Sequence, residues 1–374
     1  MSRPSGKPDW ATSSTFSGGP IIGQPNKATP SGGLISEGWD PQQSPAAEHI
    51  NYLLNNQGAF IKFFTLLGMF GDGNEGDADF DGINTRLGVV PSGSVYTFTN
   101  RLLMPMNMTV RSGVTVRLLS SPLIGGGKLT VENTGIIHNN GNAGANGAGG
   151  AAAGGDEAAY STAMLLGYGS RGGTGGATSG TTHGSDGEFN GYAAGGGGGN
   201  GGTNGGGSFG GSGGAAAMTG GLNTLRQLWG RRGWITVYQR GGDVTEVWPI
   251  GGGTGGGGGG SGSSVANGGG GGGGQGGAPL MIAFPEIAAL GACFQSKGGK
   301  GGDGAAGGSG TGGSGGGGGG GGWVQLLCAI NDNPGTALSA NCDVSGGAGG
   351  VGHTGTNGTT GSAGNIFDLL GSSW

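Results

Sequence analysis

The run Gly315–Gly322 leads directly into Trp323-Val-Gln-Leu-Leu-Cys-Ala-Ile330, and this junction of eight glycines with an apolar segment decides the fold. Glycine brings no side chain to bury, whereas the apolar segment is rich in residues that favour strands. A similar alternation occurs at 129–137, at 281–294 and at 323–344, each of which is followed by a glycine tract. The unit is a strand pair followed by a glycine rod, which predicts a stacked repeat architecture.

The composition excludes several classes of protein. Glycine supplies 106 of 374 residues, roughly 28% where soluble proteins average about 7%. Charged residues make up 10% of the chain, well below the usual share of about 25%. The net charge of −5 argues against a nucleic-acid partner. An ordinary globular enzyme does not have this composition.

The glycine tracts have two readings. Without a strict period, such tracts are usually disordered or flexible linkers. The apolar segments between the tracts have few polar residues to keep them soluble if they were unpacked, which favours an ordered structure. Collagen is excluded because glycine does not recur at every third position throughout and only 14 prolines are present. The ordered alternative is a polyglycine II-like helix with three residues per turn, whose strands bond to one another side by side. Whether these strands belong to one chain or to three stays open.

The first 70 residues predict an arm and a helix. Residues 1–43 contain five scattered prolines before residue 31 and form an extended arm. Ser44-Pro45 opens a helix at 44–70. Its apolar stripe has heptad spacing, with these positions: Ile50, Leu53, Gln57, Phe60, Phe64 and Leu67. Such a stripe packs either on its own core or, as we favour here, against two other copies in a parallel homotrimer.

The rest of the chain is expected to be a β-rich shaft at 71–138 and a glycine-rich tip at 139–374. Short strands in the shaft are expected at Val95–Phe98, Met108–Val110, Val114–Val116 and Leu129–Val131. The predicted fold class is therefore mainly β and irregular, in a fibrous homotrimer.

No segment predicts a membrane anchor or a disulfide framework. The apolar stretch Ala59–Phe70 is far shorter than the roughly 20 residues of a membrane span. No signal peptide is visible, so synthesis in a cytoplasm is expected. The cysteines Cys293, Cys328 and Cys342 are odd in number and lack zinc-ligand spacing, which predicts buried free thiols.

An aromatic and basic insert at 222–250 is the main candidate site. Its flanking segments 234–238 and 244–248 predict a β-hairpin. Aromatic and arginine side chains dominate recognition hot spots, and the candidates are Trp229, Arg231, Arg232, Trp234, Tyr238, Arg240 and Trp248. The alternative is a structural plug whose aromatics pack the shaft. A weaker candidate of the same kind spans 160–192 and includes Tyr168, Arg171, His183 and Phe189.

Metal and catalytic readings are weaker. Asp77, Asp79 and Asp81 resemble the start of a calcium loop, but position twelve is Gly88, so a solvated turn is preferred. The four histidines form no short-range ligand pair, and a histidine cluster on a threefold axis stays an alternative. The Gly-x-Gly-x-x-Gly matches are chance hits in so glycine-rich a chain. We predict no cofactor, no metal and no catalytic residue, although paired carboxylates of a depolymerase could meet only in space.

The N-terminal region resembles a known family. Lys7-Pro-Asp-Trp-Ala11, Gly38-Trp39, Pro45 and Ile50-Asn-Tyr-Leu53 are similar to the opening of tail-fibre proteins of phages and prophages. Tyr52 and Phe60 stand where that family more often has tryptophan. The glycine-rich remainder looks like the shafts and tips of phage adhesins.

This resemblance implies a function in attachment. The N-terminal region, with Trp10 and Trp39, would dock to a virion tail or baseplate protein and trimerise. Distal loops would contact a host polysaccharide or outer-membrane protein. The protein would reside in the virion, or on a bacterium that carries phage-derived fibres. The alternatives are a purely structural shaft, plug or decoration protein, and a glycan-depolymerising tailspike.

Overall fold

The computed structural model describes residues 70–99, 101–119, 121–148, 154, 171–177, 183–187, 253, 256–260, 268–307, 312–333 and 336–370. The chain divides into two compact units, Met1–Met69 and Phe70–Trp374. All of the described residues belong to the second unit. The predicted arm at 1–43 and helix at 44–70, including Trp10, Trp39 and the heptad residues, lie outside the described part except for Phe70.

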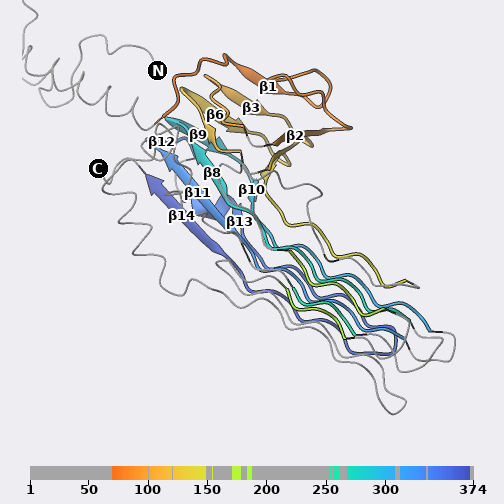
Figure 1. Ribbon diagram of the computed structural model, residues 1–374. Helices are drawn as coiled ribbons and strands as arrows, with labels where there is room; N and C mark the ends of the chain where they lie inside the picture. Colours follow the sequence, from red (N-terminus) through yellow and green to blue (C-terminus); the bar gives the residue numbers. More distant parts are fainter. Residues whose placement is uncertain are drawn as a thin grey trace, which may run out of the picture. The chain divides into compact units, whose positions relative to one another are not determined.

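Three parallel sheets form a solenoid (Figure 1). Sheet B contains β1 (Ala78–Phe80), β3 (Met108–Val110), β6 (Lys128–Val131), β9 (Glu286–Ala289) and β12 (Ile330–Asn331) in that order. Sheet D contains β2 (Val95–Thr99), β4 (Thr115–Leu119), β7 (Ile136–His138), β10 (Phe294–Gln295) and β13 (Cys342–Asp343). Sheet E contains β5 (Leu123–Ile124), β8 (Leu280–Ala283), β11 (Trp323–Cys328) and β14 (Asn365–Leu370).

Each turn of the chain adds one strand to each sheet in succession, as the parallel registers show. Phe80 pairs with Val110, and Val110 with Val131. A short 3-10 helix, Leu338–Asn341, precedes β13 and buries Leu338 completely. The expectation of a mainly β chain built from stacked short strands is confirmed, with β2 extending one residue and β4 three residues beyond the predicted ends.

The core consists of side chains stacked in columns inside the solenoid. Leu103, Leu123, Ile282 and Leu326 occupy successive positions of one column and are all fully buried. Phe80 packs edge-on against Tyr96, with ring centroids 4.8 Å apart. Burial of each large apolar side chain stabilises the fold by about 1.5–3 kcal/mol. These stacked columns therefore fix the register of every turn.

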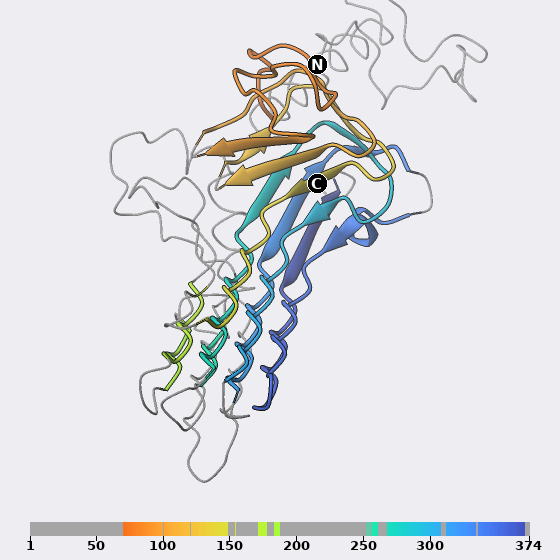
Figure 2. The ribbon, with the colours of Figure 1, turned by 90° about the vertical axis from the view of Figure 1, so that its right-hand side faces the viewer.

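The glycine rods leave the solenoid at one corner. After β7, β10 and β13 the chain runs outward in an extended strand and returns in another before it enters β8, β11 and β14. Figure 2 shows these strands side by side, running away from the sheets. The predicted unit of strands followed by a glycine rod is thus confirmed. Strands on both sides of residue 138 pair with one another within a single compact unit.

The rods are arranged in rows. Row 1 contains the outgoing strands 139–147, 296–305 and 344–352, and row 2 contains the returning strands 268–277, 312–322 and 355–364. Row 3 contains 171–177 and the strand formed by 253 and 256–260, with 183–187 beside them. Hydrogen bonds join neighbours at every third residue, as in Gly141 N–H to Lys297 C=O and Gly144 N–H to Lys300 C=O, at 2.8 and 2.9 Å. This three-residue period is that of a polyglycine II helix, and it connects strands of one chain.

Glycine is required wherever one rod faces another. A Cβ on Gly319 would lie 2.0 Å from the carbonyl oxygen of Gln275, and a Cβ on Gly302 would lie 1.9 Å from that of Ala145. Residues that face no strand carry side chains instead. In 139–147, glycine recurs at every third position, whereas in 296–305 it occupies two positions of every three. The number of glycines in each three-residue turn therefore reports how many of the three α-carbons face a neighbouring rod too closely for a side chain.

We predict that Gly319→Ala lowers the melting temperature, because the new Cβ meets backbone that cannot move aside. The expected cost in the free energy of unfolding is at least about 1–3 kcal/mol. Ala348→Ser is the control, since Ala348 is exposed on the outer face of row 1. Thermal unfolding followed by circular dichroism measures both variants. Equal melting temperatures for the two would contradict the packing described above.

Candidate functional site

The outer face of sheet B carries aligned polar side chains. Alternate residues of each strand point outward, so equivalent positions of successive turns align. The register places Asp79, Thr109 and Thr130 in one column. Lys128 and Glu286 are neighbours in the next column and form an ion pair at 2.7 Å. This face therefore offers carboxylate, amide, hydroxyl and ammonium groups on a rigid frame.

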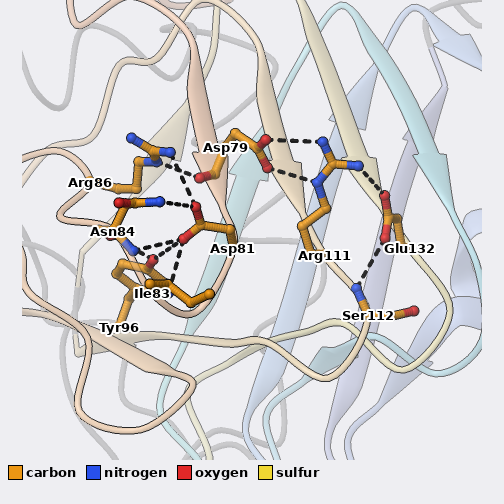
Figure 3. A network of polar contacts seen from close by, with 9 residues as sticks. All are labelled: Asp79, Asp81, Ile83, Asn84, Arg86, Tyr96, Arg111, Ser112 and Glu132. Carbon is orange, nitrogen blue, oxygen red and sulfur yellow. Dashed lines mark hydrogen bonds and ion pairs between the residues drawn. The ribbon is translucent and has the colours of Figure 1, made fainter.

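Asp81 organises the turn that follows β1. Its Oδ1 atom accepts the backbone N–H groups of Ile83 and Asn84 at 2.9 and 2.8 Å, and the hydroxyl of Tyr96 at 3.1 Å (Figure 3). Gly82, with φ of +78°, allows the tight reversal. The N–H and side chain of Asn84, together with the N–H of Ile83, hold the pKa of Asp81 well below its usual value. Asp81 is therefore a structural anion at neutral pH.

Arg111 joins two carboxylates on the same face. Its guanidinium donates to both oxygens of Asp79, at 2.9 and 3.0 Å, and to Glu132 at 2.8 Å (Figure 3). Glu132 also accepts the N–H of Ser112. The hydrogen bonds with Asp79 and then Glu132 raise the pKa of Arg111. All three side chains are about one-third to one-half exposed, so the network sets geometry more than it adds stability.

Asp79 and Asp81, which resemble part of a calcium loop in the sequence, are both held by other protein groups. Asp79 is held by Arg111, and Asp81 is held by Asn84, Ile83, Arg86 and Tyr96. Both carboxylates therefore accept hydrogen bonds from protein donors. Within the described ranges, no three His, Cys, Asp or Glu side chains are grouped so that they could hold a metal ion.

A shallow hollow lies beside this network. It has a volume of about 410 Å³ and is lined by Asp77, Ala78, Asp79, Arg86, Asn107 and Thr109. Asp77 accepts both the N–H and the side-chain amide of Asn107, at 3.1 and 2.9 Å. Such a mixture of acceptors and donors suits hydrogen bonding to hydroxyl groups. The sequence offered part of this signal in the Asp77–Asp81 cluster, but the residues from the second turn come close only through the fold.

A basic cluster marks the point where row 1 leaves sheet D. Arg117, His138, Gln295 and Asp343 occupy the same position on four adjacent strands. Lys297 pairs with Asp343 at 2.9 Å, and the Nδ1 atom of His138 accepts the N–H of Asn140 at 3.1 Å. Burial first, and then the positive charges of Arg117 and Lys297, lower the pKa of His138 to about 4. His138 is therefore neutral at pH 7.

This shift predicts a pH dependence of stability. Between pH 6.5 and pH 4 the unfolded chain binds a proton at His138 that the folded chain does not, so stability falls as the pH is lowered through this window. The slope contributed is at most about 1.4 kcal/mol per pH unit. His138→Gln keeps an acceptor for Asn140 and should flatten this part of the profile. Denaturant unfolding at several pH values tests this, and an unchanged slope in the variant would disprove it.

The sequence-predicted contact residues can be placed only in part. Trp229, Arg231, Arg232, Trp234, Tyr238, Arg240 and Trp248 lie outside the described residues, as do Tyr168 and Phe189. Arg171 and His183 are described and begin two short strands of the row 3 region. The structure does not bring them together with the sheet B hollow.

The ends of the segment that carries the aromatic and basic insert are informative. The chain leaves the described residues at Gly187 and returns at Gly253. The N–H of Gly253 donates to Gly277 at 2.7 Å, and Gly277 lies three residues before β8. Gly253 therefore lies at the end of the bundle nearer the solenoid.

Cys293 and Cys328 are buried thiols, as expected, whereas Cys342 is only half-buried. Burial raises the pKa of the Cys293 thiol to about 12, so it is unreactive at neutral pH. Among the residues that the structure describes, no helix is long and apolar enough to cross a membrane.

No protein-family model, no curated protein and no solved structure matches the chain.

Proposed function

We propose that this chain is a phage-type tail fibre protein that recognises and adheres to a host surface. The observation that carries the proposal is the glycine bundle, in which successive solenoid turns send out rods bonded to one another on several sides. Such a bundle is stiff without a large apolar core, and it holds its connecting segments on a fixed frame. Rigid presentation of loops is what a recognition module requires.

The N-terminal region supplies the rest of the proposal. Its resemblance to tail-fibre openings at Lys7–Ala11 and Gly38-Trp39 supports docking to a tail or baseplate protein. The heptad stripe at 44–70 supports a homotrimer. Three copies would multiply weak contacts with a repetitive surface polysaccharide or an outer-membrane protein. The protein would then reside in the virion, or on a bacterium that carries such fibres.

The oligomeric state is tested by light scattering on the purified full chain. We expect three times the mass of one chain. Replacing Leu53 and Phe60 by Asp should give monomers, because charge is introduced into the seam, while Ile83→Asp should not, since Ile83 is 79% exposed on the solenoid. A monomeric wild-type protein would remove the trimer from the proposal.

Adhesion is tested by binding of labelled protein to candidate host cells. We expect the full chain to bind, and the double variant Arg232→Ala and Trp234→Ala to bind at least about tenfold more weakly, as for a hot spot. Ile83→Ser is the control on the solenoid surface. Retained binding by the double variant would assign the insert a structural role as a plug.

Two further outcomes separate the alternative functions. If the full chain and particles that carry it adsorb to no host, a structural shaft, plug or decoration protein is the better assignment. If purified protein releases reducing sugar from host envelope glycans, the chain is a depolymerising tailspike.

A further inference from the structure

The hydrogen bonds that join backbone N–H and carbonyl groups of neighbouring strands within each row all run in one direction. In row 1, Gly141 donates to Lys297 and Gly298 donates to Ser345. In row 2, Gly271 donates to Ser314, and Gly315 donates to Thr356. Row 3 follows the same rule, with Gly173 donating to Gly256. Within every row the earlier strand gives N–H groups to the later strand.

The last described strands of rows 1 and 2 consequently present N–H groups that no further strand among the described residues accepts. By the three-residue period, these belong to Gly346 and Gly349 in row 1, and to Asn357, Thr360 and Ala363 in row 2. None of the five has an acceptor among the described residues. The next equivalent group, that of Gly352, donates to the side chain of Asn357 at 2.9 Å. We call the two strands 344–352 and 355–364 the donor edge.

The donor edge has a positive electrostatic character. Each peptide group carries a dipole of about 3.5 D, and aligned peptide dipoles add. One peptide group in three points along the row in each strand, so the positive ends face outward at this edge. No Asp or Glu occurs between 344 and 364. The three outward positions of row 2 are exposed, and those of Gly346 and Gly349 are partly so.

A fourth glycine strand of row 1 is excluded at this edge. In the preceding strand of row 2, a Cβ on Gly315 or Gly318 would point at the next strand of row 1, 2.0 or 1.8 Å from its carbonyl oxygens. Asn357, Thr360 and Ala363 hold the equivalent positions, so their side chains stand where a fourth strand of row 1 would lie. At the opposite edge, Asn142 and Ala145 block row 1 in the same way. A second copy therefore cannot add a strand to row 1.

We propose that the donor edge binds an extended, carboxylate-bearing polysaccharide. Its backbone N–H groups recur every three residues, about 9.3 Å apart at a rise of 3.1 Å per residue. Aligned backbone donors bind anions without a basic side chain, as they do at helix ends and in backbone nests. This inference rests on the proposed function and names the chemistry of one surface that it would recognise.

Proline substitution tests the donors without removing an internal bond. Thr360→Pro together with Ala363→Pro deletes two outward N–H groups, and the φ angle of proline suits an extended helix of this kind. Thr360→Ala with Ala363→Ser is the matched control, because it changes both side chains but keeps both N–H groups. Asn357 is left intact so that its contact with Gly352 remains. Equal melting temperatures establish that the variants are folded.

The probe is polygalacturonate, with neutral dextran for comparison, and binding is measured by biolayer interferometry at two salt concentrations. We expect the wild-type protein and the control to bind polygalacturonate, and the proline variant to bind at least about tenfold more weakly. Equal binding by the proline variant overturns the inference. If that variant does not fold, NMR amide shifts of Gly346, Gly349 and Thr360 in the wild-type protein replace it, and unchanged shifts on adding the polymer count against the proposal.

The two proposals can fail separately. Wild-type protein that adheres to host cells but ignores polygalacturonate refutes the donor edge alone. Protein that binds polygalacturonate through this edge but adsorbs to no cell refutes the fibre function alone.

Discussion

Contact between backbone carbonyl oxygens and α-carbons without side chains is the constraint on which the bundle depends. Rods approach so closely that a Cβ would lie about 2 Å from a carbonyl oxygen of the neighbouring strand at Gly302, Gly316 and Gly319. The same approach lets the N–H groups that face a neighbouring rod reach its carbonyl oxygens at 2.7–3.2 Å. Backbone hydrogen bonds thereby replace the apolar core that this part of the chain lacks. A single methyl group in the centre removes both the contact and the bond.

The solenoid supplies what the glycines cannot. Glycine loses more conformational freedom on folding than any other residue, so the rods need ends that are already fixed. Each rod pair begins on a strand of sheet D and returns to a strand of sheet E, and the registers Phe294 to Ile137 and Leu326 to Ile282 set its height. Buried columns such as Leu103, Leu123 and Ile282 hold those registers. The arrangement of the rods in the bundle therefore depends on the apolar core of the solenoid.

Charged side chains are few, and most of those described in the solenoid and the rods form ion pairs. Asp79, Arg111 and Glu132 satisfy one another on sheet B, and Lys297 pairs with Asp343 where row 1 begins. Lys300 and Asp303 do the same on the outer face of a rod. The bundle edges, by contrast, are polar through their peptide groups. Recognition by such a surface would rely on backbone donors and acceptors in a fixed spacing.

The sequence by itself determined the local elements and their repetition. Residue type and spacing predict the strands at Met108–Val110 and Leu129–Val131. They also predict the glycine rods and the buried thiols of Cys293 and Cys328. Glycine recurs at every third position in 139–147 and 355–364, which indicates rods with one α-carbon per turn facing a neighbour. The period is local, so it does not meet the collagen criterion of a glycine at every third position throughout. Only the tertiary structure decided which rods are neighbours.

Neighbouring rods are brought together by the turns of the solenoid, and their contacts join residues far apart in the chain. The backbone N–H of Lys297 donates to the side-chain oxygen of Asn140, 157 positions away. The backbone N–H of Asp303 donates to the side-chain oxygen of Asn146 in the same way. No local pattern encodes such a pairing, because it depends on how many residues each turn consumes before it returns to the same sheet. The sheet B hollow and the donor edge were invisible for the same reason, since each joins groups from different turns. Composition and spacing thus fixed what the rods are, and the stacked apolar core fixed where they lie.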